Sequence, residues 1–219
     1  MFPDITCDDI FRLETRRLWL RWLRAADAAA LANFARLAEV AQMTAAIPHP
    51  YPAGEAERFI LKARAETAGG QALILGITLK NKARTLIGLA SAEAGAGRDV
   101  EIGYIVAPVA AGRGFATEAA TALIDTIFSL TEARTVSANT RVHNLASRRI
   151  LEKCGFEFAG TEMTSLPARG GQHPCDHFKL TRFAWSARDR TRRMPSMAQQ
   201  LARRNEELEA KQGGQGWDQ

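Results

Sequence analysis

Hydrophobic and polar positions alternate in short runs along most of the chain, and two periods can be distinguished. A two-residue period, typical of half-buried strands, runs through residues 17–22, where Leu18, Leu20 and Trp22 share one side and Arg17, Trp19 and Arg21 share the other. Further runs of strand length and character lie at residues 71–79, 85–94, 100–107, 135–142, 156–162 and 176–185.

A helical period separates these runs at four places. Residues 25–43 carry an apolar stripe through Leu31 and Phe34, with Asp27 as the expected N-cap. A second helix is predicted near residues 56–67, before two glycines, and a third over Thr117–Leu130. The fourth begins after Asn144 as N-cap and stops at Gly155.

The order of these elements predicts the fold class. Three strands between residues 71 and 107 follow one another with short turns, which favours an antiparallel meander. A strand, a helix and a strand come next, and this order implies a parallel pair with a right-handed crossover. We therefore expect an α+β, mixed fold: a mostly antiparallel sheet of about six to seven strands with one parallel pair, flanked by about four helices.

Composition changes this picture little. The 219 residues are 46% hydrophobic and 24% charged, which is ordinary for one globular domain with an appendage. The net charge of +5 favours an anionic ligand. However, residues 186–219 hold seven basic and five acidic residues and so account for +2 of the charge. The small charge of the rest argues against nucleic-acid binding.

The same tail marks the expected domain boundary. Residues 1–185 form the predicted domain, and residues 186–219 form a basic tail with a thin helical stripe at Ser196–Gln212. Three cysteines without a CxxC pair fit reduced thiols. No apolar run approaches the ~20 residues of a membrane span, and no signal peptide is evident at the start, so we expect a cytoplasmic protein without a membrane partner.

One stretch, "VAAGRGFATEAATALIDTIF" at residues 109–128, carries a candidate anion site between a strand and a helix. The spacing of a P-loop is absent, and a dinucleotide fingerprint fails because Thr117 stands where the third glycine belongs. Gly112 and Gly114 instead permit a loop whose N–H groups cradle a phosphate above a helix N-terminus, with Arg113 adding charge.

Two segments together carry a family resemblance. "IGYIVAPVAAGRGFATEA" followed by "NTRVHNLASRRILEKCGFEFAGTE" resembles the acetyl-CoA-binding core of the GNAT N-acetyltransferase superfamily, with the pattern nearest to ribosomal-protein N-terminal alanine and serine acetyltransferases. The similarity extends from Leu13 to Trp185. It implies a sheet whose parallel pair splays, an acetyl-CoA co-substrate and a primary amine acceptor.

The resemblance also implies which residues bind the cofactor. The diphosphate motif falls on Ala111, Gly114 and Ala116, with Ala111 departing from the usual Gln or Arg. The loop and first turn add Gly112, Arg113, Phe115 and Thr117, the preceding strand offers Tyr104, Ile105 and Val106 to the pantetheine arm, and Asn144 and Ser147 complete the cofactor-binding set.

Catalytic candidates follow from the same alignment of motifs. Glu101, near the start of the strand before the loop, is the candidate base, acting through water on the ammonium. A tyrosine that many family members use to protonate the thiolate is replaced by Leu151, whereas Ser147 matches the serine that bonds the cofactor sulfur.

The predicted activity is acetyl transfer from acetyl-CoA to a primary amine, a protein N-terminus or a small molecule, by direct attack in a monomer or homodimer. The alternative is an acyl-CoA-binding module without turnover, which Ala111 and Leu151 keep open. His173, Cys175 and His177 lie two apart but lack a fourth ligand, so we expect no metal.

Overall fold

The computed structural model describes residues 1–95 and 97–193. The chain divides into two compact units, Met1–Arg182 and Phe183–Gln219, and the first contains the whole sheet. The helix predicted over Ser196–Gln212 lies outside the described residues.

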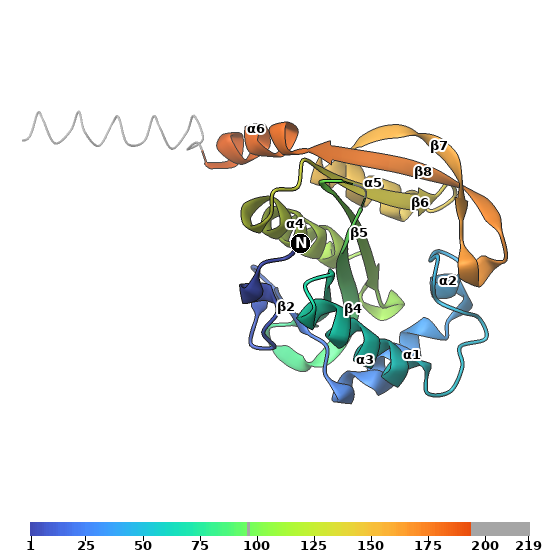
Figure 1. The fold of residues 1–219 in the computed structure, drawn as a ribbon. Helices are drawn as coiled ribbons and strands as arrows, with labels where there is room; N and C mark the ends of the chain where they lie inside the picture. Colours follow the sequence, from blue (N-terminus) through green and yellow to red (C-terminus); the bar gives the residue numbers. More distant parts are fainter. Residues whose placement is uncertain (96, 194–219) are drawn as a thin grey trace, which may run out of the picture. The chain divides into compact units, whose positions relative to one another are not determined.

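The sheet has eight strands in the order β1-β2-β3-β4-β5-β6-β8-β7 (Figure 1). Only β5 and β6 run parallel, and every other neighbouring pair is antiparallel. The predicted fold class is therefore confirmed. The strands are β1 (Arg12–Glu14), β2 (Leu18–Trp22), β3 (Ala72–Leu79), β4 (Lys82–Ala94), β5 (Asp99–Val106), β6 (Thr135–Arg141), β7 (Glu157–Ser165) and β8 (Gln172–Thr181).

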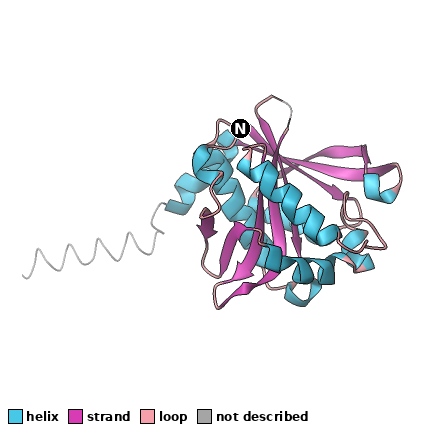
Figure 2. Ribbon diagram, turned by 60° about the horizontal axis from the view of Figure 1, so that its bottom comes forward, coloured by secondary structure: helices cyan, strands magenta, loops and turns pink. Residues whose placement is uncertain are grey.

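Helices cover both faces of the sheet (Figure 2). In the first unit, α4 packs against β2, β4, β5 and α5, whereas α1 and α3 pack against each other and against β4 and β3 respectively. The helices are α1 (Ala28–Ala35), α2 (Ala38–Ala41), α3 (Glu55–Ala68), α4 (Phe115–Leu130), α5 (Leu145–Cys154) and α6 (Arg182–Arg193).

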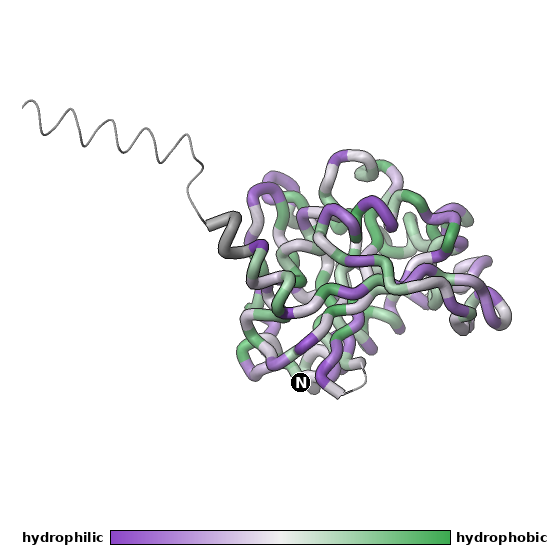
Figure 3. Tube along the Cα trace, turned by 90° about the horizontal axis from the view of Figure 1, so that it is seen from above, coloured by the Kyte–Doolittle hydropathy of each residue, from purple (hydrophilic) through white to green (hydrophobic). Residues whose placement is uncertain are grey.

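The apolar stripes of these helices form the core. Leu31 and Phe34 of α1 meet Ile60 of α3 in one buried cluster, which also includes Ile74 of β3 and Leu89 of β4. Along the trace, hydrophobic and hydrophilic positions alternate in short segments (Figure 3). This is the pattern of elements buried on one side, whereas β3, in the middle of the sheet, is buried along almost its whole length. Among the described residues, no helix has the length and hydropathy to cross a bilayer.

The N-terminal part differs from the sequence prediction in its polar contacts. Asp27 makes no side-chain cap at α1. Its carboxylate instead accepts two hydrogen bonds from Arg21, at 2.8 and 2.9 Å, and one from the Arg24 N–H. Arg21 is consequently buried, so the side of β2 expected to carry exposed polar residues is partly internal. Pairing and hydrogen bonding of both charges make that burial tolerable.

Several boundaries also differ: α4 begins at Phe115 instead of Thr117, β4 at Lys82 instead of residue 85, and β8 at Gln172 instead of residue 176. The last strand ends at Thr181, not at residue 185, because α6 begins at Arg182. The Arg182 guanidinium donates to three carbonyls at the end of α4 and just beyond it, those of Phe128, Thr131 and Ala133. With this contact the two-residue alternation of the last strand ends. The predicted first helix is divided by the extended backbone of Leu37, and β1 is an additional strand of three residues.

Candidate active site

The centre of the sheet contains a break in strand pairing. β5 and β6 are paired only at Asp99↔Thr135, Val100↔Val136 and Glu101↔Ser137. Both strands continue beyond this point, β5 to Val106 and β6 to Arg141, without pairing to each other, and they diverge (Figure 1). The parallel pair is thus splayed, and Glu101 stands at the last paired position.

The break leaves main-chain groups of β5 without a partner strand. Ala107 N donates to Ile87 O, and Gly95 N donates to Asp99 O, in the same antiparallel register. Because hydrogen-bonded pairs alternate in such a ladder, the odd-numbered residues of β5, Ile105 included, bond to β4. The amides of Tyr104 and Val106 therefore face the β6 side, where the strands have parted. Ile105, predicted with them, faces β4 with its main chain.

The glycine loop follows directly on this strand. Gly112 and Gly114 adopt left-handed conformations, with φ of 73° and 75°, which glycine enters without steric cost. Residues 111–114 are all exposed. Phe115, Ala116 and Thr117 form the first turn of α4, whose N–H groups have no acceptor within the helix and whose dipole favours an anion. These features fit a diphosphate.

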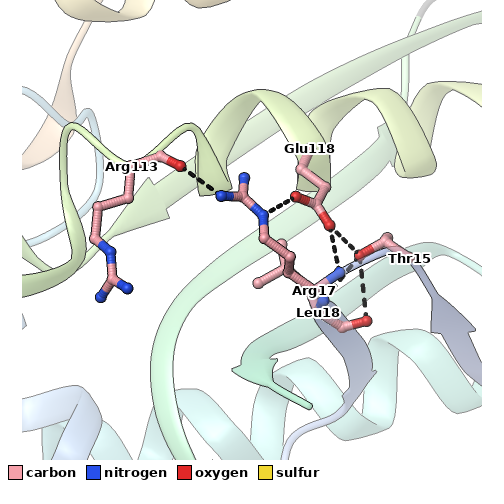
Figure 4. Close-up of polar contacts among 5 residues, drawn as sticks. All are labelled: Thr15, Arg17, Leu18, Arg113 and Glu118. Carbon is pink, nitrogen blue, oxygen red and sulfur yellow. Dashed lines mark hydrogen bonds and ion pairs between the residues drawn. The ribbon is translucent and has the colours of Figure 1, made fainter. Parts of the chain in front are cut away.

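Arg17, in the turn before β2, reaches this loop from a distant part of the chain (Figure 4). Its Nη1 donates to the Arg113 carbonyl at 3.0 Å and its Nε to Glu118 Oε2 at 2.6 Å. The Arg17 and Arg113 guanidinium groups both lie over the Phe115 ring, 4.6 and 4.9 Å from its centroid. The N-terminal end of α4 together with the glycine loop, which we call the mouth of α4, therefore carries two cationic side chains.

Ser147 lies in the first turn of α5, where three contacts meet. Asn144 caps this helix as predicted, because its Oδ1 accepts from the Ser147 N–H at 3.1 Å. The Tyr104 hydroxyl lies 3.0 Å from Ser147 Oγ and 3.2 Å from the Ser147 carbonyl oxygen. Burial raises the pKa of Tyr104, and the Ser147 hydrogen bond lowers it only in part, so the phenol stays protonated.

Glu101 lies in a row of polar groups across neighbouring strands. It is in register with Glu93 of β4, and Asn139 Nδ2 donates to its Oε1 at 3.0 Å. Partial desolvation raises the pKa of Glu101, and the Glu93 carboxylate raises it further, whereas Asn139 and His177 act in the opposite direction. A raised pKa brings a carboxyl closer to the range in which it can accept and release protons.

The predicted residues thus fall into two groups. Tyr104, Asn144 and Ser147 are joined by direct hydrogen bonds, and the loop residues lie together at the mouth of α4. Glu101 is on the same strand as Tyr104, but with its side chain on the other face of the sheet. In the described ranges, no group of three or more His, Cys, Asp or Glu side chains, His173, Cys175 and His177 included, is arranged to hold a metal ion.

Sequence reasoning missed two parts of this site. It assigned Tyr104 only through its main chain, and it gave no role to Arg17 or Glu118. The contacts join residues 43 positions apart for Tyr104 and Ser147, and 96 apart for Arg17 and Arg113. No local motif encodes such separations.

A family model described as "Acetyltransferase (GNAT) domain" matches residues 17–157. The search of curated proteins gave no match.

Solved structures share the fold at low identity. Mycobacterium smegmatis RimJ in complex with CoA-disulfide has a TM-score of 0.63 at 26% identity, over 75% of this chain and 81% of that one. The ribosomal-protein-S5-alanine acetyltransferase from Vibrio fischeri has a TM-score of 0.67 at 20% identity, over 80% and 98%. RimL, the ribosomal L7/L12 alpha-N-protein acetyltransferase, in complex with coenzyme A, has a TM-score of 0.69 at 18% identity, over 78% and 98%.

Proposed function

The chain belongs to the GNAT acetyltransferase family, as its sequence resemblance predicts, and from this premise we propose that it moves the acetyl group of acetyl-CoA to a primary amine. Membership supports acyl transfer in general. The donor, the class of acceptor and the residue roles below are our proposal.

The observation that carries the proposal is the splayed strand pair beside the glycine loop. Anchored at the mouth of α4, the diphosphate of acetyl-CoA would direct the pantetheine arm along β5. The arm's amides would pair with the main chain of Tyr104 and Val106, which the parting of the strands leaves facing away from β4. Asn144 fits a further contact, because its Nδ2 donates to no other residue within the described ranges.

Glu101 is the proposed base. The amine nitrogen forms a bond to the acetyl carbon as the carbon–sulfur bond breaks, and the amine must lose a proton for this attack. The Glu101 carboxylate stands where β5 and β6 part, and its raised pKa suits proton acceptance through a water molecule.

Ser147 is the proposed hydrogen-bond donor to the departing thiolate, which leaves as an anion stabilised by the serine O–H. Its hydroxyl is positioned by Tyr104, whose one O–H proton lies within reach of both the Ser147 carbonyl and Ser147 Oγ. When that proton turns to Oγ, the serine O–H is free to bond the sulfur. Tyr104 therefore supports the step that a tyrosine at the position of Leu151 performs in many relatives.

A protein N-terminus is the proposed acceptor. The support comes from the structural neighbours, which include a RimJ at 26% identity and acetyltransferases named for ribosomal proteins. A small-molecule amine is the other candidate, and the experiment below separates the two.

The test is a panel of N-terminal peptides and small amines with acetyl-CoA, read as release of free CoA thiol. We expect turnover with peptides beginning with alanine or serine. Acetyl-CoA, and not NAD, should raise the melting temperature, by the shift that ~2.7 kcal/mol of ligand stabilisation causes at a concentration of 100 times Kd.

Two variants connect the panel to the residues. Ser147→Ala should lower kcat more than it weakens acetyl-CoA binding, and Tyr104→Phe should lower kcat in the same direction but less. Stabilisation by acetyl-CoA without thiol release from any acceptor would instead favour the non-catalytic binding module.

A further inference from the structure

The contacts of Arg17 have a geometric consequence for the diphosphate loop. A trans peptide unit is planar, so its C=O and its N–H point in opposite directions. Arg17 Nη1 holds the carbonyl of Arg113, which belongs to the same peptide unit as the Gly114 N–H. Fixing that carbonyl toward Arg17 therefore fixes the Gly114 N–H on the opposite side.

This peptide unit has little else to determine its orientation. Gly114 has φ of 75° and ψ of 10°, and Gly112, on the other side of Arg113, also has a positive φ. Turning the Arg113–Gly114 peptide changes the φ of Gly114, and glycine takes either sign of φ readily, so this rotation meets a low steric barrier. A rotated peptide would turn the Arg113 carbonyl, an acceptor, toward the anion.

Arg17 is itself held in place by Glu118, in the first turn of α4. Oε2 of Glu118 accepts from Arg17 Nε, and Oε1 accepts from the Arg17 main-chain N–H at 2.7 Å and from Thr15 Oγ1 at 2.6 Å. Partial burial raises the pKa of Glu118, but the hydrogen bonds from Thr15 and Arg17 outweigh this, and the pKa lies below its usual value. Glu118 is therefore ionised at neutral pH.

The Arg17 side chain also lies close to Gly114 itself. Nη2 donates to no residue within the described part of the chain, and it lies 3.5 Å from the position that a Cβ on Gly114 would take. The family motif places Gln or Arg at the position of Ala111, and this chain therefore lacks that polar side chain in the loop.

We propose that Arg17 is the positioning residue of the diphosphate loop: held by Glu118, it fixes the Arg113–Gly114 peptide with the Gly114 N–H toward the diphosphate. The inference rests on the proposed acetyl-CoA site. It gives the turn before β2 a role in binding acetyl-CoA, and the sequence motif of the glycine loop does not include that turn.

The test compares Arg17→Gln with Arg16→Gln, which removes the same charge from the exposed neighbouring residue. Isothermal titration with CoA and with pantetheine, which lacks the diphosphate, gives the affinities. We expect Arg17→Gln to weaken CoA binding about tenfold or more, the size expected for a charge-assisted hydrogen bond. Pantetheine binding by Arg17→Gln, and both affinities of Arg16→Gln, should stay within about twofold of wild type.

Arg17→Lys separates orientation from charge. Lysine keeps the positive charge but lacks the planar fork that bonds a carbonyl and a carboxylate at once, so it should recover CoA affinity only in part. With the best acceptor of the panel, Arg17→Gln should raise KM for acetyl-CoA and leave kcat at saturation near the wild-type value.

Several results would overturn the inference. One is an unchanged CoA affinity in Arg17→Gln. Another is an equal loss of CoA and pantetheine affinity in Arg17→Gln, which indicates general damage to the fold. The third is a full recovery of CoA affinity in Arg17→Lys, which means that the positive charge alone suffices. A wild-type chain that does not bind CoA would overturn the proposed function as well. The three results above would overturn only the role of Arg17, so the two failures are distinguishable.

Discussion

At the scale of single residues, the candidate site depends on side chains that modify one another. Glu93 and Glu101 are directly opposite on β4 and β5, and like charges in this position repel. The repulsion adds to desolvation in raising the pKa of Glu101. The carboxylate of Glu93 thereby makes Glu101, the proposed base, more basic.

This coupling gives a pH prediction. If Glu101 is the base, kcat/KM falls as the pH drops through its raised pKa, because the protonated acid cannot accept a proton. Glu93→Gln removes the repulsion, lowers the pKa of Glu101, and should shift the acidic limb of the kcat/KM profile to lower pH. The pH profile of kcat/KM, recorded with the best acceptor of the panel, measures this shift. Glu101→Gln is the control, and it should lose the acidic limb of the profile and most of the activity. An acidic limb that does not move would exclude the coupling.

At the scale of elements, the sequence was sufficient for most of the architecture. Period, order and cap residues predicted the meander, the parallel pair and the helix from Asn144 to Gly155, because each depends on local pattern. β1 was missed because three residues cannot display a period. α6 was missed because the hydrogen bonds of Arg182, at the end of β8, are made to carbonyls about fifty positions away.

The candidate site was predictable to the same extent. The loop, Asn144 and Ser147 are adjacent to recognisable turns and caps. The Tyr104 hydroxyl and Arg17 reach the site through tertiary packing, and a linear motif carries no information on the direction of a side chain that crosses between elements.

The loop at the start of α4 can be tested against a matched glycine elsewhere. Gly114 and Gly97 both have positive φ, and a Cβ at either would meet no described atom closer than 3.5 Å. Alanine at either position should cost about 1–2 kcal/mol of stability from backbone strain. Only Gly114→Ala should also weaken CoA binding, because its methyl group enters the diphosphate cradle. Thermal melts and CoA titrations of both variants provide the comparison, and equal CoA affinity in the two would argue against the cradle.

At the scale of the whole molecule, the division of the chain into units suggests where the activity resides. The sheet, the loop and Ser147 all belong to Met1–Arg182. We propose that residues 1–185 form the acetyltransferase domain and that the basic segment after them is dispensable for catalysis.

A chain ending at Trp185 tests this proposal. It should keep its melting temperature within about 2–4 °C of the full chain, which corresponds to ~1 kcal/mol in a domain of this size. Its kcat/KM with a short peptide acceptor should stay within about twofold, measured side by side with the full chain. A large loss with intact folding would assign the segment a catalytic or acceptor-binding role.

The early parting of β5 and β6 also affects how the protein avoids unwanted association. Unpaired strand edges on a protein surface invite intermolecular strand pairing and aggregation. Here the unpaired amides lie between two strands whose opposite edges are already occupied, β5 by β4 and β6 by β8. To reach these amides, a strand from another molecule would have to insert between β5 and β6 in the middle of the sheet. The gap that we propose for the pantetheine arm is thus shielded from neighbouring polypeptides by β5 and β6 themselves.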